Sequence, residues 1–167
     1  SEIDLPLINV LSSIEKNGIK VNTKYLNQLS EEFQKDSSVL EKKIYKFAGK
    51  NFNIGSPKQL GEILFVDLSI QGGKKTKSGT FSTDSSTLSS LSDQGYEIAS
   101  LILDWRELTK LKSTYTDTLQ NQATKNNSRV HTSYGVANTL TGRLSSNDPN
   151  LQNIPIRTSN GRKIRKA

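Results

Sequence analysis

The sequence has 167 residues with 23 Lys and Arg against 16 Asp and Glu, which gives a formal net charge of +7 and a pI of about 9.6. Apolar residues make up only 32%, and even with glycine added the total stays below the roughly 45–50% of globular domains, so we expect a thin core. The absence of Cys and the single His exclude disulfides, thiolate zinc sites and paired imidazole ligands.

The first half of the chain is predicted to be helical. A short helix is expected before Asn17-Gly18, which has the composition of a helix stop. A long helix over residues 22–48 follows, because its apolar residues recur at steps of three, four and seven. These residues are Leu26, Leu29, Phe33, Leu40, Ile44 and Phe47. One narrow apolar stripe on a charged rod indicates packing against one partner helix, as in an antiparallel pair.

The next segment contains a capping box and a loop. Ser56-Pro57-Lys58-Gln59 predicts a helix over residues 56–65. Residues 69–83 are rich in Gly, Lys, Ser and Thr and have no periodicity, which predicts a flexible loop. After a short helix over residues 84–91, the helical period returns over residues 96–120, which we expect to be the partner of the first long helix.

The chain changes character near residues 121–128. Val130, Thr132 and Tyr134 alternate, which predicts a strand over residues 129–134, and residues 141–155 have the composition of loops. Residues 129–167 contain seven basic residues and one acidic residue, a net charge of +6. Clustered positive charge favours a polyanion such as nucleic acid as partner. A basic surface that serves only solubility is the alternative.

Several kinds of chemistry are excluded by the motifs that the sequence lacks. It has no Gly-x-Ser-x-Gly elbow and no phosphate-binding Gly-x4-Gly-Lys-[Ser/Thr] loop. A two-metal site needs converging carboxylates, yet Asp148 is the only acidic residue after Asp117. The residues by themselves therefore indicate a binding module rather than a complete enzyme.

A fifteen-residue string points to a known family. Residues 141–155 read Thr-Gly-Arg-Leu-Ser-Ser-Asn-Asp-Pro-Asn-Leu-Gln-Asn-Ile-Pro, and this string resembles the signature that precedes the first catalytic motif of the bacterial family A DNA polymerases. Three further stretches are similar to the family in order and spacing, so the resemblance covers nearly the whole chain. They are residues 6–21, Leu111-Lys112-Ser113-Thr114-Tyr115-Thr116-Asp117 and Arg129-Val130-His131-Thr132-Ser133-Tyr134.

The resemblance implies a fold and a division into parts. The fold would be mainly α, with the helices at 22–48 and 96–120 as the long antiparallel pair of a polymerase thumb and the loop at 69–83 as its tip. A short β and loop segment from the start of the palm would follow. Residues 1–21 would be an N-terminal helix leading into the polymerase region, residues 22–128 the thumb, and residues 129–167 a partial palm that ends before the first catalytic carboxylate.

The resemblance also implies an activity and partners. The parent protein would be a DNA-directed DNA polymerase, a nucleotidyltransferase of DNA replication and repair in the bacterial cytoplasm, associated with the nucleoid. Primer–template DNA is the expected partner of these residues. Catalytic residues, Mg²⁺ and dNTPs would belong to other regions, so we expect this chain to bind no cofactor or metal and to be inactive alone. An autonomous non-catalytic DNA-binding or helical interaction module is the alternative.

The expected state of the chain follows from its composition and its strand. No apolar run approaches the ~20 residues of a membrane span, so no membrane contact is expected. We expect a monomer. A palm strand without neighbours leaves backbone groups unpaired, so residues 129–167 are expected to be disordered or to pair with another copy.

Candidate contact residues follow from the resemblance. Minor-groove contacts are expected from Arg143, Asn150, Gln152 and Asn153. Contacts to the DNA backbone are expected from Lys74, Lys75, Lys77, Ser78, Thr80, Ser82, Arg106, Lys110, Ser113 and Thr114. Arg157 is a weaker candidate for the active-site cleft, and residues 162–166 would lead into a palm strand or fray.

Each candidate also has a purely structural alternative. Arg143 could be satisfied by a nearby carboxylate, and Arg106 could pair with Asp104 or Glu107. The amides of residues 150–153 could bond to the loop backbone instead of to DNA. The lysine-rich loop could be merely solvated.

Overall fold

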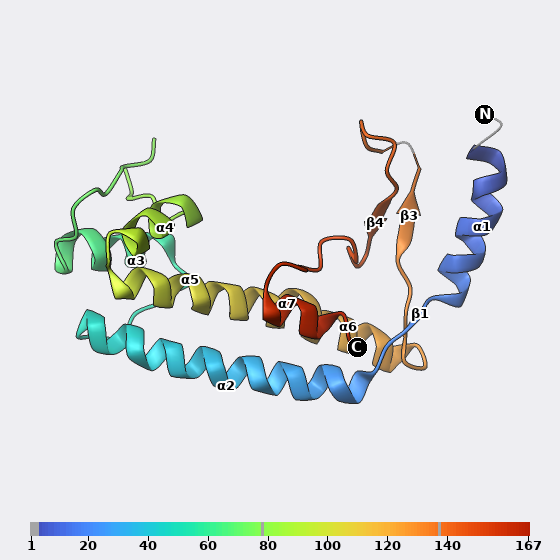
Figure 1. The fold of residues 1–167 in the computed structure, drawn as a ribbon, viewed down its shortest axis with the longest axis horizontal. Coiled ribbons are helices and arrows are strands. Elements are labelled where there is room, and N and C mark those ends of the chain that lie inside the picture. Colours follow the sequence, from blue (N-terminus) through green and yellow to red (C-terminus); the bar gives the residue numbers. More distant parts are fainter. Residues whose placement is uncertain (1–3, 78, 137) are drawn as a thin grey trace. The chain divides into compact units, whose positions relative to one another are not determined.

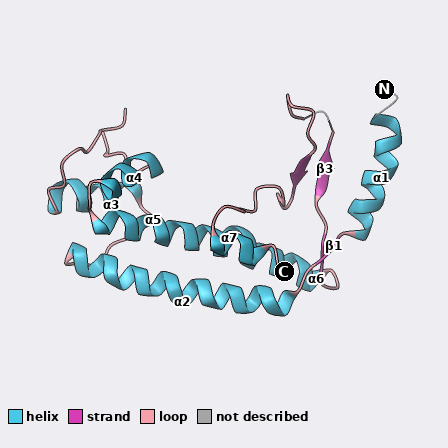
Figure 2. Cartoon of the chain, in the orientation of Figure 1, coloured by secondary structure: helices cyan, strands magenta, loops and turns pink. Residues whose placement is uncertain are grey.

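The computed structural model describes residues 4–77, 79–136 and 138–167, and helices dominate the described chain (Figures 1 and 2). The mainly α fold class predicted from the sequence is confirmed. Contacts divide the chain into two compact units. Unit 2 is the single stretch Phe33–Lys110, whereas unit 1 combines the described residues of Ser1–Glu32 with Leu111–Ala167.

Unit 1 begins with α1 (Asp4–Asn17) and β1 (Ile19–Lys20). Gly18 ends α1 with φ of +62° and donates its N–H to the carbonyl of Ile14 at 2.8 Å. Ile8 and Ile14 of α1 are 52% and 42% exposed, whereas Leu11 is buried. β1 pairs antiparallel with β2 (Arg129–Val130), so a two-stranded ladder closes this end of the unit.

Helix α2 (Thr23–Ala48) begins one residue after its predicted start and contributes to both units. In unit 1, Gln120 donates to Asn27 at 3.0 Å and Ser30 donates to Asp117 at 2.5 Å, a pairing order that makes α2 antiparallel to α6 (Asp117–Lys125). The predicted apolar stripe is wrong at Phe47, which is 45% exposed. Phe47 lies in the last turn of α2, one turn beyond the fully buried Ile44.

The core of unit 2 lies among α2, α3 (Pro57–Glu62), α4 (Ser85–Asp93) and α5 (Glu97–Lys110). Its buried cluster is Ile44, Ile54, Leu60, Leu64, Ile70, Leu88, Leu91, Ile98, Ala99, Leu101 and Ile102. The Ser56 side chain accepts the N–H of Gln59, as the capping box predicted. The reciprocal bond differs, because Gln59 Oε1 accepts the N–H of Asn53 at 2.8 Å. After α3, the π-helical segment η1 (Ile63–Asp67) completes this part.

The segment predicted to be a flexible loop folds back on itself. Lys75 and Phe81 form an antiparallel bridge, and the N–H of Ser82 donates to the carbonyl of Lys74 at 2.7 Å. Phe81 packs this segment against η1 and α3. The centroid of its ring lies 5.0 Å from that of Phe65, and its Cβ would lie 2.9 Å from a Cβ built at Gly61. We call residues 74–77 and 79–82 the tip hairpin.

The second long helix contains a π-helical segment that its periodicity did not predict. After α5, η2 (Leu111–Thr116) leads into α6, which continues to Lys125, five residues beyond the predicted end. Lys112 Nζ lies 2.7 Å from Asp117 Oδ2. A spacing of five residues matches the i→i+5 repeat of the π-helix, and Thr118 likewise donates to the carbonyl of Ser113.

The segment that the sequence assigned to one strand forms two short strands. β2 ends at Val130, and β3 (Ser133–Gly135) pairs antiparallel with β4 (Ser145–Asn147). Between them the buried hydroxyl of Thr132 lies 2.9 Å from the carbonyl of Asn147. Each of the two short strands thus has a neighbour within this chain, β1 for β2 and β4 for β3.

The basic segment near residue 160, which was expected to lead into a palm strand or to fray, contains a short helix. Helix α7 (Ser159–Ile164) begins where the Thr158 hydroxyl accepts the N–H of Gly161 at 3.1 Å. A Cβ built at Gly161 would lie 2.5 Å from the carbonyl oxygen of Pro155. The glycine therefore permits a close approach of the helix to the preceding loop.

Candidate nucleic-acid interface

Arg143 lies in the turn between β3 and β4. The hydroxyl of Thr139 donates to the backbone carbonyl of Arg143 at 2.7 Å, and the preceding Gly142 has φ of +71°. The guanidinium is exposed and makes no hydrogen bond or ion pair with any residue that the structure describes. The carboxylate partner considered in the sequence analysis is thus absent from the described residues, and the guanidinium is available to a ligand.

The other three minor-groove candidates lie in residues 149–153, which we call the amide loop. Asn150 Oδ1 accepts the N–H of Gln152 at 3.0 Å and that of Asn153 at 3.2 Å, an Asx turn. Gln152 Nε2 donates to the carbonyl of Leu144 at 2.7 Å. The loop-stabilising role therefore holds for Asn150 Oδ1 and for the Gln152 amide. The NH₂ groups of Asn150 and Asn153 remain as donors.

Buried hydroxyls hold the amide loop from the side of the strands. The Ser146 hydroxyl is fully buried and accepts the N–H of Leu151 at 3.2 Å. The Thr132 hydroxyl lies 2.7 Å from Ser146 Oγ and 2.8 Å from the carbonyl of Pro149. These bonds satisfy polar groups that would be costly to bury alone, and they connect the amide loop to β4.

Sequence reasoning missed a residue that contacts the amide loop from the helix. Tyr115 of η2 is only 5% exposed, and its hydroxyl donates to the backbone carbonyl of Asn153 at 2.5 Å. The signal available in the sequence was the position of this tyrosine in the motif at residues 111–117. The partner lies 38 residues away, so its identity needed the structure.

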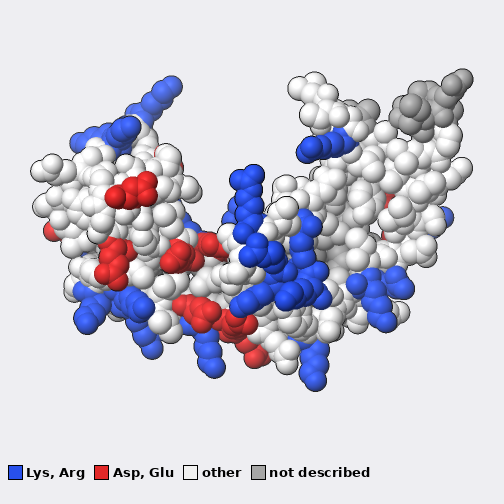
Figure 3. All heavy atoms as spheres, in the orientation of Figure 1, with Lys and Arg blue, Asp and Glu red and all other residues white. Residues whose placement is uncertain are grey.

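The tip hairpin of unit 2 presents the lysines predicted to contact DNA. Lys74, Lys75 and Lys77 are exposed and form no ion pair within the described residues, whereas Ser78 lies outside those residues. Lys75 Nζ lies 5.6 Å from the centroid of the Phe81 ring. Figure 3 shows Lys and Arg side chains at the outer end of this hairpin. Backbone hydrogen bonds hold the segment from which these lysines extend.

The hydroxyls of the tip hairpin bond to neighbouring groups. Ser82 donates to Asp84 Oδ2 at 2.9 Å, and the hydroxyls of Thr76 and Thr80 lie 2.9 Å apart. These residues therefore brace the hairpin and the start of α4. A hydroxyl that donates in this way can still accept a hydrogen bond, but its proton is already engaged.

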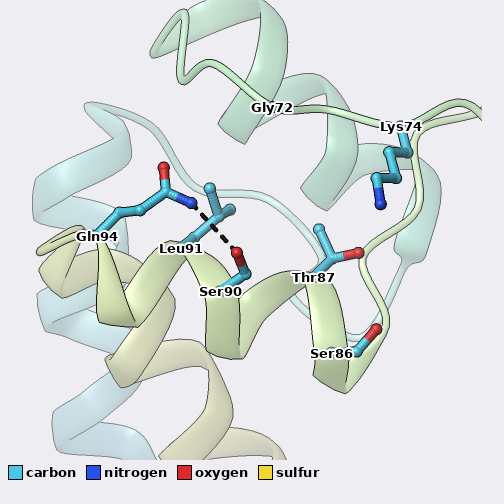
Figure 4. A pocket seen from close by; sticks show the side chains of 7 residues that line it. All are labelled: Gly72, Lys74, Ser86, Thr87, Ser90, Leu91 and Gln94. Carbon is cyan, nitrogen blue, oxygen red and sulfur yellow. Dashed lines mark hydrogen bonds between the residues drawn. The ribbon is translucent and has the colours of Figure 1, made fainter.

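A hollow of about 280 Å³ lies between the tip hairpin and α4 (Figure 4). Lys74 enters it from the hairpin, and α4 contributes the hydroxyls of Ser86, Thr87 and Ser90. Asp84 caps α4, and the bond from the Thr87 N–H, followed by that from Ser86, holds the pKa of the Asp84 carboxyl well below its ordinary value. The Asp84 carboxylate thus already accepts a backbone N–H at the start of α4.

Arg106 of α5 forms neither of the ion pairs considered in the sequence analysis. Its half-buried guanidinium donates to the carbonyl of Thr83 at 2.5 Å and to the Thr83 hydroxyl at 3.3 Å. Burial lowers the pKa of Arg106, and the charge of Asp84 opposes this shift. Arg106 therefore holds Thr83, the residue that directly follows the tip hairpin. Lys110, Ser113 and Thr114 are exposed.

The basic residues around α7 are mostly engaged by the chain itself. Figure 3 shows Lys and Arg side chains gathered over α7. Arg162 donates to the carbonyl of Arg157 at 3.1 Å, Arg165 donates to that of Ile154 at 3.2 Å, and Lys163 pairs with Glu32. The guanidinium of Arg157 is exposed and unpaired within the described residues.

The described residues do not fit a catalytic metal. Among residues 4–77, 79–136 and 138–167, no group of three or more His, Cys, Asp or Glu side chains could hold an ion. The Mg²⁺ implied for the parent enzyme thus has no ligand set in the described part. Within the same residues, no helix has the length and apolar character needed to cross a membrane.

Comparisons with known proteins agree with one another. The model of DNA polymerase family A matches residues 23–167. DNA polymerase I of Rhizobium leguminosarum is 52% identical over 99% of this chain and 16% of that protein, and DNA polymerase I of Pseudomonas aeruginosa is 47% identical over 100% and 18%. The chain therefore spans less than a fifth of the length of these relatives.

A solved structure extends the likeness to the fold. It is the POL domain of Pol1 from M. smegmatis in complex with DNA primer–template and dNTP, which is 42% identical to this chain and superposes with a TM-score of 0.87. The match covers 98% of this chain and 28% of that one.

Proposed function

This chain belongs to DNA polymerase family A, and we propose that it holds primer–template DNA for template-directed nucleotidyl transfer in replication and repair. Residues 22–128 would form the thumb, with the tip hairpin at its end, and residues 129–167 the first part of the palm. The proposal is supported by relatives that are DNA polymerase I. It is also supported by a similar structure that contains primer–template DNA.

The observation that carries the proposal is the exposed Arg143 guanidinium, which has no partner within the described residues. Arg143 directly precedes Leu144, whose carbonyl accepts from Gln152 of the amide loop. Purine N3 and pyrimidine O2 are acceptors shared by all base pairs in the minor groove. Donors from Arg143, Asn150 and Asn153 would test the shape of a pair rather than its sequence, which suits an enzyme that copies any template. Because internal bonds already hold the loop, binding would cost little ordering entropy.

Contacts to the DNA backbone would come from residues outside this loop. Phosphate contacts position a duplex without reading its sequence. Lys74, Lys75 and Lys77 of the tip hairpin supply exposed cations, and Lys110, Ser113 and Thr114 supply an ammonium and two hydroxyls on the second long helix. We assign Arg106 a role in supporting the hairpin, because its guanidinium is bonded to Thr83.

Chemistry would need regions of the parent protein beyond these residues. The dNTP site and the Mg²⁺ ligands would lie there, so we expect no primer extension by the 167 residues alone. A longer chain that includes the rest of the polymerase region should extend a primer on a template. Absence of extension by that longer chain would contradict the polymerase assignment.

A titration of fluorescently labelled primer–template, followed by anisotropy at several salt concentrations, tests DNA binding. The logarithm of the association constant should fall with the logarithm of salt by about 0.9 for each phosphate neutralised. Arg143→Ala should weaken binding roughly tenfold, as expected for loss of one good base contact. Lys35→Ala, which removes the same charge from an exposed face of α2, should have little effect. Absence of binding at low salt would refute the proposal.

A further inference from the structure

Tyr115 makes a contact that the proposed function does not yet use. The ring is buried in η2, and the hydroxyl donates to the backbone carbonyl of Asn153 at 2.5 Å. Burial raises the pKa of the Tyr115 phenol, so the group stays protonated and remains a donor around neutral pH. Because the acceptor is a backbone atom, the bond orients the loop itself and leaves the Asn153 side chain available.

The amide loop has two kinds of restraint. The Asx turn of Asn150 and the bond from Gln152 to Leu144 connect the loop to itself and to the neighbouring hairpin. The bond from Tyr115 instead connects the loop to the helix. Loss of the Tyr115 hydroxyl would therefore leave the internal shape of the loop intact and release its register against η2.

Two side-chain bonds to Asp117, the first residue of α6, connect η2 to α2. Asp117 accepts from Lys112 at 2.7 Å and from the Ser30 hydroxyl at 2.5 Å, so the end of the π-helical turn is fixed to α2 within unit 1. Ser113 and Thr114, the expected phosphate contacts on η2, immediately precede Tyr115. One tyrosine thus lies between the predicted phosphate contacts and the predicted base contacts.

We propose that Tyr115 is a positioning residue that sets the distance between the phosphate contacts on η2 and the minor-groove donors of the amide loop. The inference rests on the proposed function. In a duplex, the distance from a phosphate to the minor-groove edge of a nearby base is set by the DNA. The two contact sets can therefore act together only when the loop keeps its register against the helix.

The test compares Tyr115→Phe with Tyr25→Phe. Tyr25 lies in the same unit, is half-buried, and its hydroxyl makes no hydrogen bond among the described residues, so its phenylalanine variant controls for loss of a phenol. Binding is measured for natural primer–template and for DNA with a 3-deazapurine at the primer end, which lacks the N3 acceptor. The readouts are the ratio of these affinities and the salt slope.

The expected result separates positioning from simple stability. The unmodified chain and Tyr25→Phe should bind natural DNA several-fold more tightly than 3-deaza DNA. In Tyr115→Phe this ratio should fall toward one, while the salt slope stays unchanged because the phosphate contacts remain. A ratio that survives in Tyr115→Phe, or a slope that falls together with the ratio, overturns the inference and leaves the proposed function standing.

Two further outcomes are decisive. If the unmodified chain binds natural and 3-deaza DNA equally tightly, with normal salt dependence, the minor-groove contact is contradicted. The inference about Tyr115 is then overturned as well. Absence of salt-dependent binding in the unmodified chain refutes the proposed function itself. The failures of the two proposals are thus distinguishable in one set of titrations.

Discussion

Gly18 and His131 show how single residues fix the junction after α1. The Nδ1 atom of His131 lies 2.7 Å from the carbonyl of Glu15, and because a carbonyl oxygen only accepts, Nδ1 carries the proton. The imidazole ring covers Gly18, where an added Cβ would lie 2.8 Å from Cε1. The one histidine of the chain is therefore occupied in the fold.

Gly18→Ala should destabilise unit 1 for two reasons. Its φ of +62° is unfavourable for alanine, and the new methyl group would collide with the His131 ring. Together these effects should lower the free energy of unfolding by about 2 kcal/mol or more. Urea unfolding followed by circular dichroism measures the change.

Gly49→Ala is the matched control, because Gly49 also follows a helix and has φ of +70°, but no atom lies within 4 Å of its added Cβ. This variant should lose about 1 kcal/mol, from backbone strain alone. Equal losses in the two variants would show that the histidine ring yields without cost.

Features of the candidate site were predictable from the sequence where neighbouring residues determine them. They were not predictable where the hydrogen-bond partners are distant in the sequence. Gly142-Arg143 in a polar loop indicated an exposed guanidinium, and the structure agrees. The bond from Gln152 to Leu144 spans eight residues, and that from Arg106 to Thr83 spans 23. Such partners depend on how the chain folds back, which no spacing rule along the sequence provides.

At the scale of elements, Arg106 joins α5 to Thr83, the residue that directly follows the tip hairpin. Replacing Arg106 with Gln should release the end of the hairpin, because a hydrogen bond from a charged donor contributes about 1.5–3 kcal/mol. The amide of Ser82, which donates to the carbonyl of Lys74 within the hairpin, should then exchange with solvent about tenfold faster without DNA. Hydrogen exchange followed by mass spectrometry measures this rate.

Lys110→Gln is the control for this experiment, since Lys110 lies one turn away on α5 and is exposed. It should leave the exchange of Ser82 unchanged and weaken only DNA binding. Unchanged exchange in Arg106→Gln would contradict the role of Arg106 in holding the hairpin.

How accurately each element was predicted from the sequence depends on its length. The 26-residue helix α2 has enough repeats for its period to be read from the sequence to within one residue. The six residues of η2 change the helical period by less than one turn, so the spacing of apolar residues predicted one uninterrupted helix across them. Strands β3 and β4 have three residues each and depend on one another, and the loop composition of residues 141–155 concealed β4.

At the scale of the whole molecule, the basic residues differ in whether their side chains are bonded to the chain itself. Residues 129–167 have a net charge of +6, yet Arg129, Arg162 and Arg165 donate to backbone carbonyls and Lys163 pairs with Glu32. These side chains stabilise the fold. The lysines of the tip hairpin are exposed and have no such bonds within the described residues.

Replacing Lys74, Lys75 and Lys77 together with Gln should therefore reduce the salt dependence of DNA binding. If each lysine neutralises one phosphate, the slope should fall by up to about 2.7, at about 0.9 per contact. The control replaces Lys35, Lys42 and Lys43 of α2, which are exposed and change the net charge equally. Equal changes in slope would mean that overall charge, rather than the hairpin, controls binding.

The division into units was beyond what composition could indicate. Composition changes near residues 121–128, where helical sequence gives way to strands and loops, whereas the contacts divide the chain after Glu32 and after Lys110, inside helical segments. A local sequence pattern reports the type of structure. It does not report which distant segments meet, such as Ile19 and Val130.

The pairing of β1 with β2 has a consequence for the order of folding. Unit 2 is continuous, so it can form as soon as its own 78 residues, Phe33–Lys110, have been synthesised. Unit 1 must wait until Val130 reaches Ile19, and closing so long a loop is entropically costly and slow. If the ribosome paused after Lys110 and before Val130, unit 2 could therefore be folded while the two sequence segments of unit 1 were not yet paired.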